Sequence, residues 1–424
     1  MSTELLPAVG SRPAGHRRAL VAACVGNTVE WYDFALFGGS ATVMAAVLTP
    51  GGWGGFTAVF AVFATSCLFR PLGSLIIGAR ADRVGRKPAL AATILLMAAA
   101  TFAIGLLPPW SAIGLAAPLG LLALRAAQAF SAGGEIGVSV SYLAEFSPPG
   151  RRARDGGWYL STVGLGLALG LGVTAVVAAA LDPASLTQWG WRIPFLLALP
   201  LGLVGVYLRR RLDESPVFSA APTQGRVRPR QVLSDHLPAV RRAFLVAGAY
   251  SATFTVWFIF VPSYLTATGN SSLARALGFA LAGLLASGVA APIFGLLADR
   301  VGRRPVLMGA TGTLAVVIAP LYVWTLGGST AALLVSNVIV GCIVAAFVLP
   351  AFLAEQFPGA VRATGIGLAF GVSSAVIGGT APLLATVLAR QAPAVVVPGY
   401  LAVLAVAALV AVLRSPESRP APGH

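Results

Sequence analysis

The sequence predicts an all-α membrane protein with twelve transmembrane helices, arranged as two six-helix halves related by pseudo-two-fold symmetry. The 424 residues are 57% hydrophobic and 10% charged, and the mean hydropathy is +0.84. These values are typical of a multi-spanning membrane protein and exclude an ordinary soluble domain. About twelve apolar runs approach the roughly 20 residues that one membrane crossing needs. In addition, two polar motifs occur once in each half of the chain.

Glycine, proline and arginine separate the apolar runs. In order, the expected spans are 19–48, 55–79, 89–108, 112–145, 156–180, 191–209, 242–268, 274–298, 305–326, 330–354, 363–389 and 396–413. The expected organisation is an N-terminal tail at 1–18, an N-terminal six-helix half at 19–209, a central loop at 210–241, a C-terminal six-helix half at 242–413 and a C-terminal tail at 414–424. The first run continues well beyond the length of a signal-peptide core, so no cleavable signal peptide is expected.

The basic residues predict the orientation. If the N-terminus is cytoplasmic, 24 of the 29 lysines and arginines fall on the cytoplasmic side and 3 fall in outer loops. This bias follows the positive-inside rule. We therefore expect a multi-pass protein of the plasma (inner) membrane, with both termini and the central loop in the cytoplasm. The formal charge of +15 comes from short clusters between apolar runs, so it does not indicate a nucleic-acid partner.

The two halves share two motifs. The first, Gly-x3-Asp-Arg-x-Gly-Arg followed by a second basic residue, covers 78–87 after the second span and 295–304 after the eighth. The second, Glu-x2-Pro-x3-Arg-Ala, covers 145–153 and 355–363. Two different motifs at matching places indicate an internal repeat.

The first motif resembles the signature loop of the major facilitator superfamily. Four further stretches resemble the metabolite:proton symporter family, which includes permeases for proline/betaine, α-ketoglutarate, citrate and shikimate. They are 26–34 in span one, 70–73 in span two, 124–135 in span four and 214–218 after span six. The resemblance covers nearly the whole chain, and it implies a secondary transporter that works by alternating access.

Glu30 and Asp33 lie on one face of the first span, where a carboxylate in hydrocarbon needs compensation. At 1.5 Å per residue, Asp33 lies about 22 Å along span one and Arg125 about 18 Å from the outer end of span four. Both are thus near the midplane, and we expect them to pair. Proton binding at Asp33 would free Arg125 to meet a substrate carboxylate, which would couple the two movements. A static ion pair is the alternative.

Two more acids are candidates for proton coupling. Glu30 is a second proton site beside Asp33, because both acids share one helix face. Glu135 lies about 15 Å further toward the cytoplasm than Arg125. It is either an inner proton acceptor or a local structural partner.

We predict a gating role for the signature loops, with a purely topological role as the alternative. The acidic residue of each copy, Asp82 or Asp299, can cap or pair with neighbouring helix ends and latch one conformation. The basic residues are expected to face the anionic inner leaflet of the bilayer and the partner helix. The loop residues concerned are Asp82, Arg83, Gly85, Arg86 and Lys87, and Asp299, Arg300, Gly302, Arg303 and Arg304.

The C-terminal half has no charged residue at mid-membrane, so its part of a substrate pocket is expected to be aromatic and neutral. Tyr250, Trp257 and Tyr264 recur at a spacing of seven on one face. Such a face could hold a quaternary ammonium by cation–π attraction, although packing is the alternative. The expected pocket residues are Tyr32, Arg125, Gln128, Tyr250, Trp257 and Asn337.

The sequence favours a proton-coupled symporter that imports a small organic solute, a carboxylate or zwitterion such as proline/betaine or a dicarboxylate. A proton-driven efflux antiporter is the alternative, although 164–172 in span five lacks the proline of the antiporter motif. No nucleophile–histidine set or nucleotide loop supports an enzyme. The expected partners are protons, the solute and the lipid bilayer, and we expect the protein to function as a monomer.

Neither a cofactor nor a metal site is expected. The three cysteines have no motif spacing. His16 and His424 are assigned to the tails and His236 to the central loop, which argues against an intramembrane histidine relay. Small residues over 164–170 and 365–367 are expected to let helices pack closely.

Overall fold

The computed structural model describes residues 15–50, 61–62, 65–148, 150–215, 218, 229–391 and 395–416. These residues form helices and connecting segments, without a strand among them. Nine helical stretches in this part of the chain are long and apolar enough to cross a membrane. The basic residues Arg12, Arg226, Arg228 and Arg419, which support the expected orientation, lie outside the described residues, as does the first part of expected span two.

The described part of the N-terminal half contains ten helical segments. They are α1 (His16–Leu48), α3 (Phe69–Val84), α4 (Arg86–Leu106), α5 (Trp110–Ile113), α6 (Ala116–Phe146), α7 (Arg152–Ala180), α8 (Pro183–Ser185), η1 (Leu186–Gly190), α9 (Arg192–Leu196) and α10 (Ala198–Arg210). The segments from α8 to α10 form one continuous stretch of spanning length, in which η1 is a π-helical turn.

The C-terminal half begins within the expected central loop. Its segments are α12 (Pro229–Asp235), α13 (Leu237–Thr255), η2 (Val256–Phe260), α14 (Val261–Ala267), α15 (Leu273–Val301), α16 (Arg303–Leu326), α17 (Thr330–Ala346), α18 (Leu349–Glu355), η3 (Gly359–Val361), α19 (Arg362–Ser373), η4 (Ser374–Gly378), α20 (Ala381–Gln391) and α21 (Val396–Leu413). Both η2 and η4 are π-helical turns within longer helices.

The signature motifs are almost entirely helical. The expected loops between spans two and three and between spans eight and nine are therefore too long. α3 continues to Val84 and α4 begins at Arg86, with Gly85 alone between them. Gly85 has φ 118, and Gly302 has φ 106 at the equivalent place between α15 and α16. Only glycine adopts this backbone conformation without strain. Polar residues extend each helix, and one glycine per motif reverses the chain.

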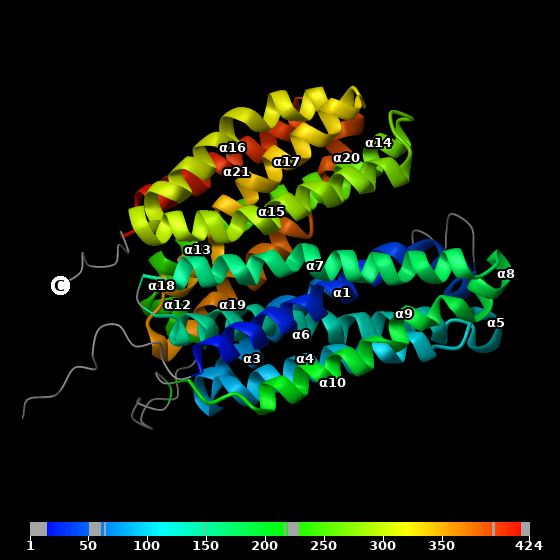
Figure 1. The fold of residues 1–424 in the computed structure, drawn as a ribbon, viewed down its shortest axis with the longest axis horizontal. Coiled ribbons are helices and arrows are strands. Elements are labelled where there is room, and N and C mark those ends of the chain that lie inside the picture. The colour runs from blue at the N-terminus through cyan, green and yellow to red at the C-terminus, as the bar shows by residue number, and fades with distance from the viewer. Residues whose placement is uncertain are drawn as a thin grey trace, which may run out of the picture.

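Close backbone contacts join the two halves along α7 and α15, which run side by side (Figure 1). A Cβ at Gly157 of α7 would lie 2.4 Å from the carbonyl oxygen of Ala291 of α15. A second close contact joins α6 and α19, where a Cβ at Gly137 would lie 2.6 Å from the carbonyl oxygen of Ala363. The expectation that small residues permit close packing is confirmed within the N-terminal half too, because a Cβ at Gly170 would lie 2.7 Å from the carbonyl oxygen of Tyr32.

The halves meet at one end. Among the described residues, the hydrogen bonds between them cluster around the signature motifs, and the one furthest from these motifs runs from the Ser161 hydroxyl to the carbonyl of Gly288. From there, α15 slopes away from α7 toward the end that carries α8 and α14 (Figure 1). The structure is therefore closed at the end with the signature motifs.

Candidate functional site

Glycines place α3 directly against α6, and this contact builds the site. A Cβ at Gly73 would lie 1.8 Å from the carbonyl oxygen of Phe130, and a Cβ at Gly133 would lie 2.1 Å from that of Arg70. The Ser74 hydroxyl donates to the carbonyl of Gly133 at 2.7 Å. Because no side chain separates the two helices at these glycines, their backbones touch. Arg70 of α3 therefore lines the same cavity as Arg125 and Gln128 of α6.

Asp33 and Arg125 form a buried ion pair, as expected. Arg125 Nη1 donates to Asp33 Oδ2 at 3.2 Å, and the two residues are only 5% and 6% exposed. The Gln128 side-chain amide and the Thr101 hydroxyl, the latter at 2.8 Å, donate to Asp33 Oδ1. Arg125 also donates to Gln128 Oε1 at 2.8 Å, and its guanidinium lies 4.3 Å from the centre of the Phe37 ring. This network satisfies both oxygens of Asp33 and engages Arg125 on two sides.

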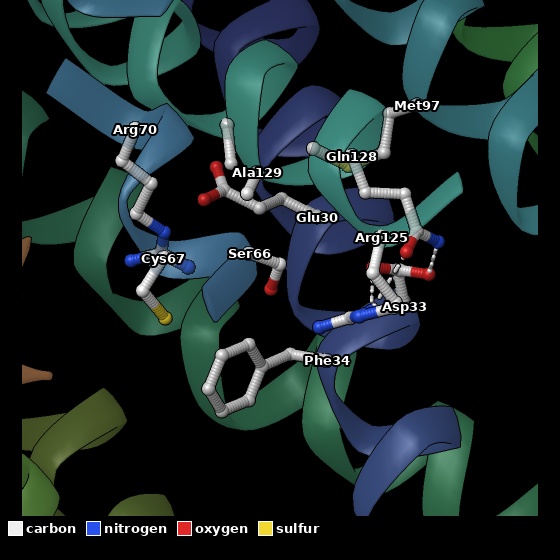
Figure 2. A pocket seen from close by; sticks show the side chains of 11 residues that line it. Glu30, Asp33, Phe34, Ser66, Cys67, Arg70, Met97, Arg125, Gln128 and Ala129 are labelled. Carbon is white, nitrogen blue, oxygen red and sulfur yellow. Dashed lines mark hydrogen bonds and ion pairs between the residues drawn. The ribbon is translucent and has the colours of Figure 1, made fainter. Parts of the chain in front are cut away.

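A cavity opens beside this pair (Figure 2). Its charged lining residues are Glu30 and Asp33 from α1, Arg70 from α3 and Arg125 from α6, and its other lining residues are Phe34, Ser66, Cys67, Met97, Gln128, Ala129 and Ala132. The enclosed space is about 20 Å³, which is room for one water molecule. All lining residues belong to the N-terminal half. The site is therefore a polar, charged pocket inside the first group of helices.

Glu135 lies in a second buried ion pair. Both of its oxygens accept from the guanidinium of Arg209 in α10, and the Thr93 and Ser139 hydroxyls also donate to it. Arg209 is 1% exposed. Of the two possibilities left open for Glu135, this geometry favours a local structural partner.

The acidic residues of the signature motifs cap helices of the opposite half. Asp82 accepts from the backbone N–H groups of Ala363 at 3.3 Å and Thr364 at 2.8 Å, in the first turn of α19. Asp299 accepts from the N–H groups of Ala153 at 3.1 Å and Arg154 at 2.9 Å, in the first turn of α7. Helix N-termini favour a negative charge, so both contacts stabilise the closed end.

Two of the basic signature residues are buried, contrary to the expectation that they face the inner leaflet. Arg86 is 2% exposed and pairs with Asp82 at 3.0 Å and Glu145 at 3.3 Å. Arg303 is 3% exposed and pairs with Asp299 and Glu355, both at 3.0 Å. Each arginine follows its aspartate by four residues, which puts both on one face despite the intervening glycine.

The remaining basic residues of the motifs are at least partly accessible. Arg83 and Arg300 are exposed, and Lys87 and Arg304 are partly exposed. The expectation that basic residues of the motifs face the inner leaflet stays a prediction for these four.

The other expected pocket residues do not line this cavity. The Tyr32 hydroxyl donates to the carbonyl of Pro194 at 2.7 Å, and the Asn337 side chain donates to the carbonyl of Leu333 at 2.7 Å. Trp257 is fully buried and packs edge-on against Tyr322 within the C-terminal half. Tyr250 and Trp257 have different neighbours, and the π-helical turn η2 begins between them.

An aromatic row instead joins the halves next to the cavity. The ring centroids of Phe34 and Trp31 are 5.4 Å apart, and those of Trp31 and Phe254 of α13 are 5.2 Å apart. Phe254 then stacks on Tyr250 at 6.4 Å. Among the expected aromatic residues of the C-terminal half, Tyr250 thus belongs to the row that leads from the cavity.

Sequence reasoning missed three ionisable side chains. Arg70 lines the cavity, and its signal was an arginine inside an apolar run. Arg209 was expected as the last residue of span six without a role at the site, and it lies in the last turn of α10 and pairs with Glu135. His16, assigned to the tail, is the first residue of α1, and its Nε2 lies 2.7 Å from Asp155 Oδ2. No group of three or more metal-ligating side chains occurs in the described part of the chain.

Known proteins resemble this chain in sequence. The family model described as "Sugar (and other) transporter" matches residues 19–242. The proline/betaine transporter of Salmonella typhimurium is 34% identical over 414 residues, covering 93% of this chain and 82% of that protein. The glycine betaine/proline/ectoine/pipecolic acid transporter OusA of Dickeya dadantii is 32% identical over 419 residues, covering 93% and 82%.

Solved structures share the fold. The proton:xylose symporter XylE, bound to 6-bromo-6-deoxy-D-glucose, superposes with a TM-score of 0.77 at 18% identity, over 97% of this chain and 98% of that chain. The human organic anion transporter MFSD10 gives a TM-score of 0.67 at 16% identity, over 94% and 99%. At these identities, the structural likeness establishes the fold alone.

Proposed function

Because this chain belongs to the sugar (and other) transporter family of the major facilitator superfamily, we propose that it is a proton-coupled symporter that imports a small zwitterionic or carboxylate solute. Its relatives and its fold are those of solute transporters and not of enzymes. The similar proline/betaine transporters motivate the choice of proline and glycine betaine as the first solutes.

The Asp33–Arg125 pair carries this proposal. Asp33 is an ionisable group that adjoins a cavity and depends on Arg125, Gln128 and Thr101 for compensation. Protonation removes the charge that holds Arg125, so binding of a proton and rearrangement of the pocket become linked. The caps at Asp82 and Asp299 supply the conformational half of the cycle, because rocking of the halves must break them.

We also propose twelve spans with both termini in the cytoplasm. The helices α1 and α6, with 33 and 31 residues, are long enough to cross a bilayer although they carry the charged residues of the site. In the N-terminal half, α3 (Phe69–Val84) is the described end of expected span two. The positive-inside bias then places the signature motifs at the cytoplasmic face. In this orientation, the structure is closed toward the cytoplasm.

Proteoliposomes with an imposed inward proton gradient test the proposal. Uptake of labelled glycine betaine and proline is compared with that of α-ketoglutarate, citrate and shikimate, with and without a protonophore. Symport predicts protonophore-sensitive accumulation of a zwitterion or a carboxylate. Uptake that ignores the protonophore would contradict proton coupling, and loss of preloaded solute driven by the gradient would indicate export.

A further inference from the structure

We propose that Arg70 and Glu30 form the receptor for the two ends of a zwitterionic solute, with Arg70 binding its carboxylate and Glu30 lying beside its cationic end. This inference rests on the proposed transport function and specifies its substrate class. It also assigns the substrate carboxylate to Arg70, whereas the sequence alone suggests Arg125.

The contacts of Arg125 leave it little capacity for a solute. Its guanidinium lies between Asp33, Gln128 and the Phe37 ring, and its residue is 5% exposed. A substrate carboxylate that displaced Asp33 would leave a buried carboxylate without its partner, which is costly. Arg125 is therefore assigned to the proton site, and the substrate anion needs another cation.

Arg70 is that cation. It lines the same cavity, is partly exposed, and lies with its guanidinium 6.0 Å from the centre of the Phe34 ring. A guanidinium offers donors in a planar fork that matches a carboxylate, so Arg70 has the position and the chemistry to bind the substrate carboxylate.

Glu30 is the matching carboxyl group. It also lines the cavity and is partly exposed, and it forms no ion pair or hydrogen bond with another described residue. Figure 2 shows the carboxylate of Glu30 on the same side of the cavity as Arg70, with no interaction drawn between the two. Arg70 and Glu30 thus line one cavity without pairing with each other. Such an arrangement suits a ligand that carries both a positive and a negative charge.

The aromatic row strengthens the cationic subsite. Phe34 lines the cavity, and Trp31 and Phe254 continue the row into the C-terminal half. Aromatic faces attract quaternary and secondary ammonium groups. Because Phe254 belongs to α13, a cation that packs on Phe34 is linked through Trp31 to the C-terminal half, which ties substrate binding to the relative movement of the halves. A dianionic solute would instead place its second carboxylate beside Glu30.

The enclosed space of about 20 Å³ must widen to admit such a solute. Arg70 and Glu30 are partly exposed, whereas Asp33, Arg125 and Gln128 are each 6% exposed or less, so we place the widening at Arg70 and Glu30. Substrate entry between Arg70 and Glu30 therefore leaves the proton site intact.

Three ligands of one shape test this assignment: glycine betaine carries both charges, choline lacks the anion, and 3,3-dimethylbutyrate lacks the cation. Their affinities are measured by isothermal titration calorimetry on purified protein in nanodiscs, without a proton gradient. The wild type is expected to prefer glycine betaine. Arg70→Gln should weaken glycine betaine about 10- to 100-fold and leave choline unchanged. Glu30→Gln should weaken glycine betaine and leave 3,3-dimethylbutyrate unchanged.

Two further variants keep the result interpretable. Arg70→Lys retains the charge and should bind glycine betaine with intermediate affinity, even if Arg70→Gln folds poorly. Arg275→Gln removes an exposed arginine at the start of α15, whose side chain donates to Thr330, and should match the wild type.

The outcomes separate this inference from the proposed function. Suppose that Arg70→Gln prefers glycine betaine over choline and 3,3-dimethylbutyrate as strongly as the wild type does, and that the wild type shows proton-driven betaine uptake. This result would overturn the assignment of Arg70 and Glu30 as the receptor and leave the proposed function standing. Binding of carboxylates but of no zwitterion, with glycine betaine, proline and ectoine all tried, would overturn the receptor and redirect the substrate class. A wild type that neither binds nor transports any of these solutes would overturn both.

Discussion

Asp82 and Asp299 occupy equivalent positions in opposite halves, and each caps a helix of the other half. Asp82 of α3 accepts from the first turn of α19, and Asp299 of α15 accepts from the first turn of α7. Each aspartate is also held by the arginine four residues later. The internal repeat of the sequence thus appears in the structure as two reciprocal contacts that close one end of the molecule.

Substitution of either aspartate by asparagine should raise the fraction of molecules in which the end with the signature motifs is open. Asp82→Asn removes the charge facing the N-terminus of α19 and leaves Arg86 with one acid fewer, at a cost of about 1–3 kcal/mol to the closed state. We expect slower transport at normal expression, and a larger effect when Asp299→Asn is added. Uptake rates per inserted protein measure this, with Asp235→Asn on the exposed surface as the control.

Opening can be followed at Ser74, which faces α19 in the closed structure because a Cβ at Gly371 would meet its hydroxyl at 2.1 Å. In a variant without native cysteines, Ser74→Cys should be alkylated faster when Asp82→Asn is present. Equal alkylation rates would show that the aspartate does not hold the end closed.

A methyl group at the contact between the halves should have a similar effect. Gly157→Ala would place its Cβ 2.4 Å from the carbonyl oxygen of Ala291, so α7 and α15 must separate. Gly172→Ala on the same helix meets nothing within 4 Å, and should be neutral or slightly stabilising. We expect a lower melting temperature and slower uptake for the first variant only, and identical behaviour of the two would count against tight packing as the cause.

The Asp33–Arg125 pair could be predicted from the sequence because two independent constraints agree. At 1.5 Å per residue along their spans, both residues are predicted to lie near the membrane midplane. There each charge needs an opposite charge to compensate for the loss of water. The partner of Asp82 could not be predicted in this way, because Thr364 lies 282 residues further along the chain. A single charge pattern does not specify which backbone it will cap.

Residues near the ends of apolar runs were harder to place. Arg209 was expected at the last position of span six and His16 in the N-terminal tail, but both lie in helices with their side chains buried. Trp257 lies in the π-helical turn η2, which carries no clear sequence signal, so its packing against Tyr322 could not be predicted from the spacing of seven. Hydropathy locates a transmembrane helix well. It does not predict where the last turn of the helix ends, or where a π-helical turn inserts an extra residue.

The Glu135–Arg209 pair should contribute mainly to stability. Arg209→Gln leaves a buried carboxylate without its cation, and we expect a loss of about 3–5 kcal/mol in the free energy of unfolding. The double variant with Glu135→Gln should recover much of this loss, because two neutral amides can bond each other. Thermal unfolding of the purified variants forms the double-mutant cycle. A Glu135→Gln variant that folds normally but loses proton-driven accumulation would instead mark Glu135 as a proton acceptor.

Asp33→Asn should separate solute exchange from proton coupling. The asparagine side chain retains an oxygen that can accept from Gln128 and Thr101, the donors now bound to Asp33 Oδ1. The variant should therefore fold, yet it cannot bind a proton at this position. We expect accumulation driven by a pH gradient to vanish while counterflow of solute between preloaded and external pools continues. Asp182→Asn, at the exposed N-cap of α8, is the matched control and should accumulate solute like the wild type. Undiminished accumulation by Asp33→Asn would assign the Asp33–Arg125 pair to holding α1 and α6 together.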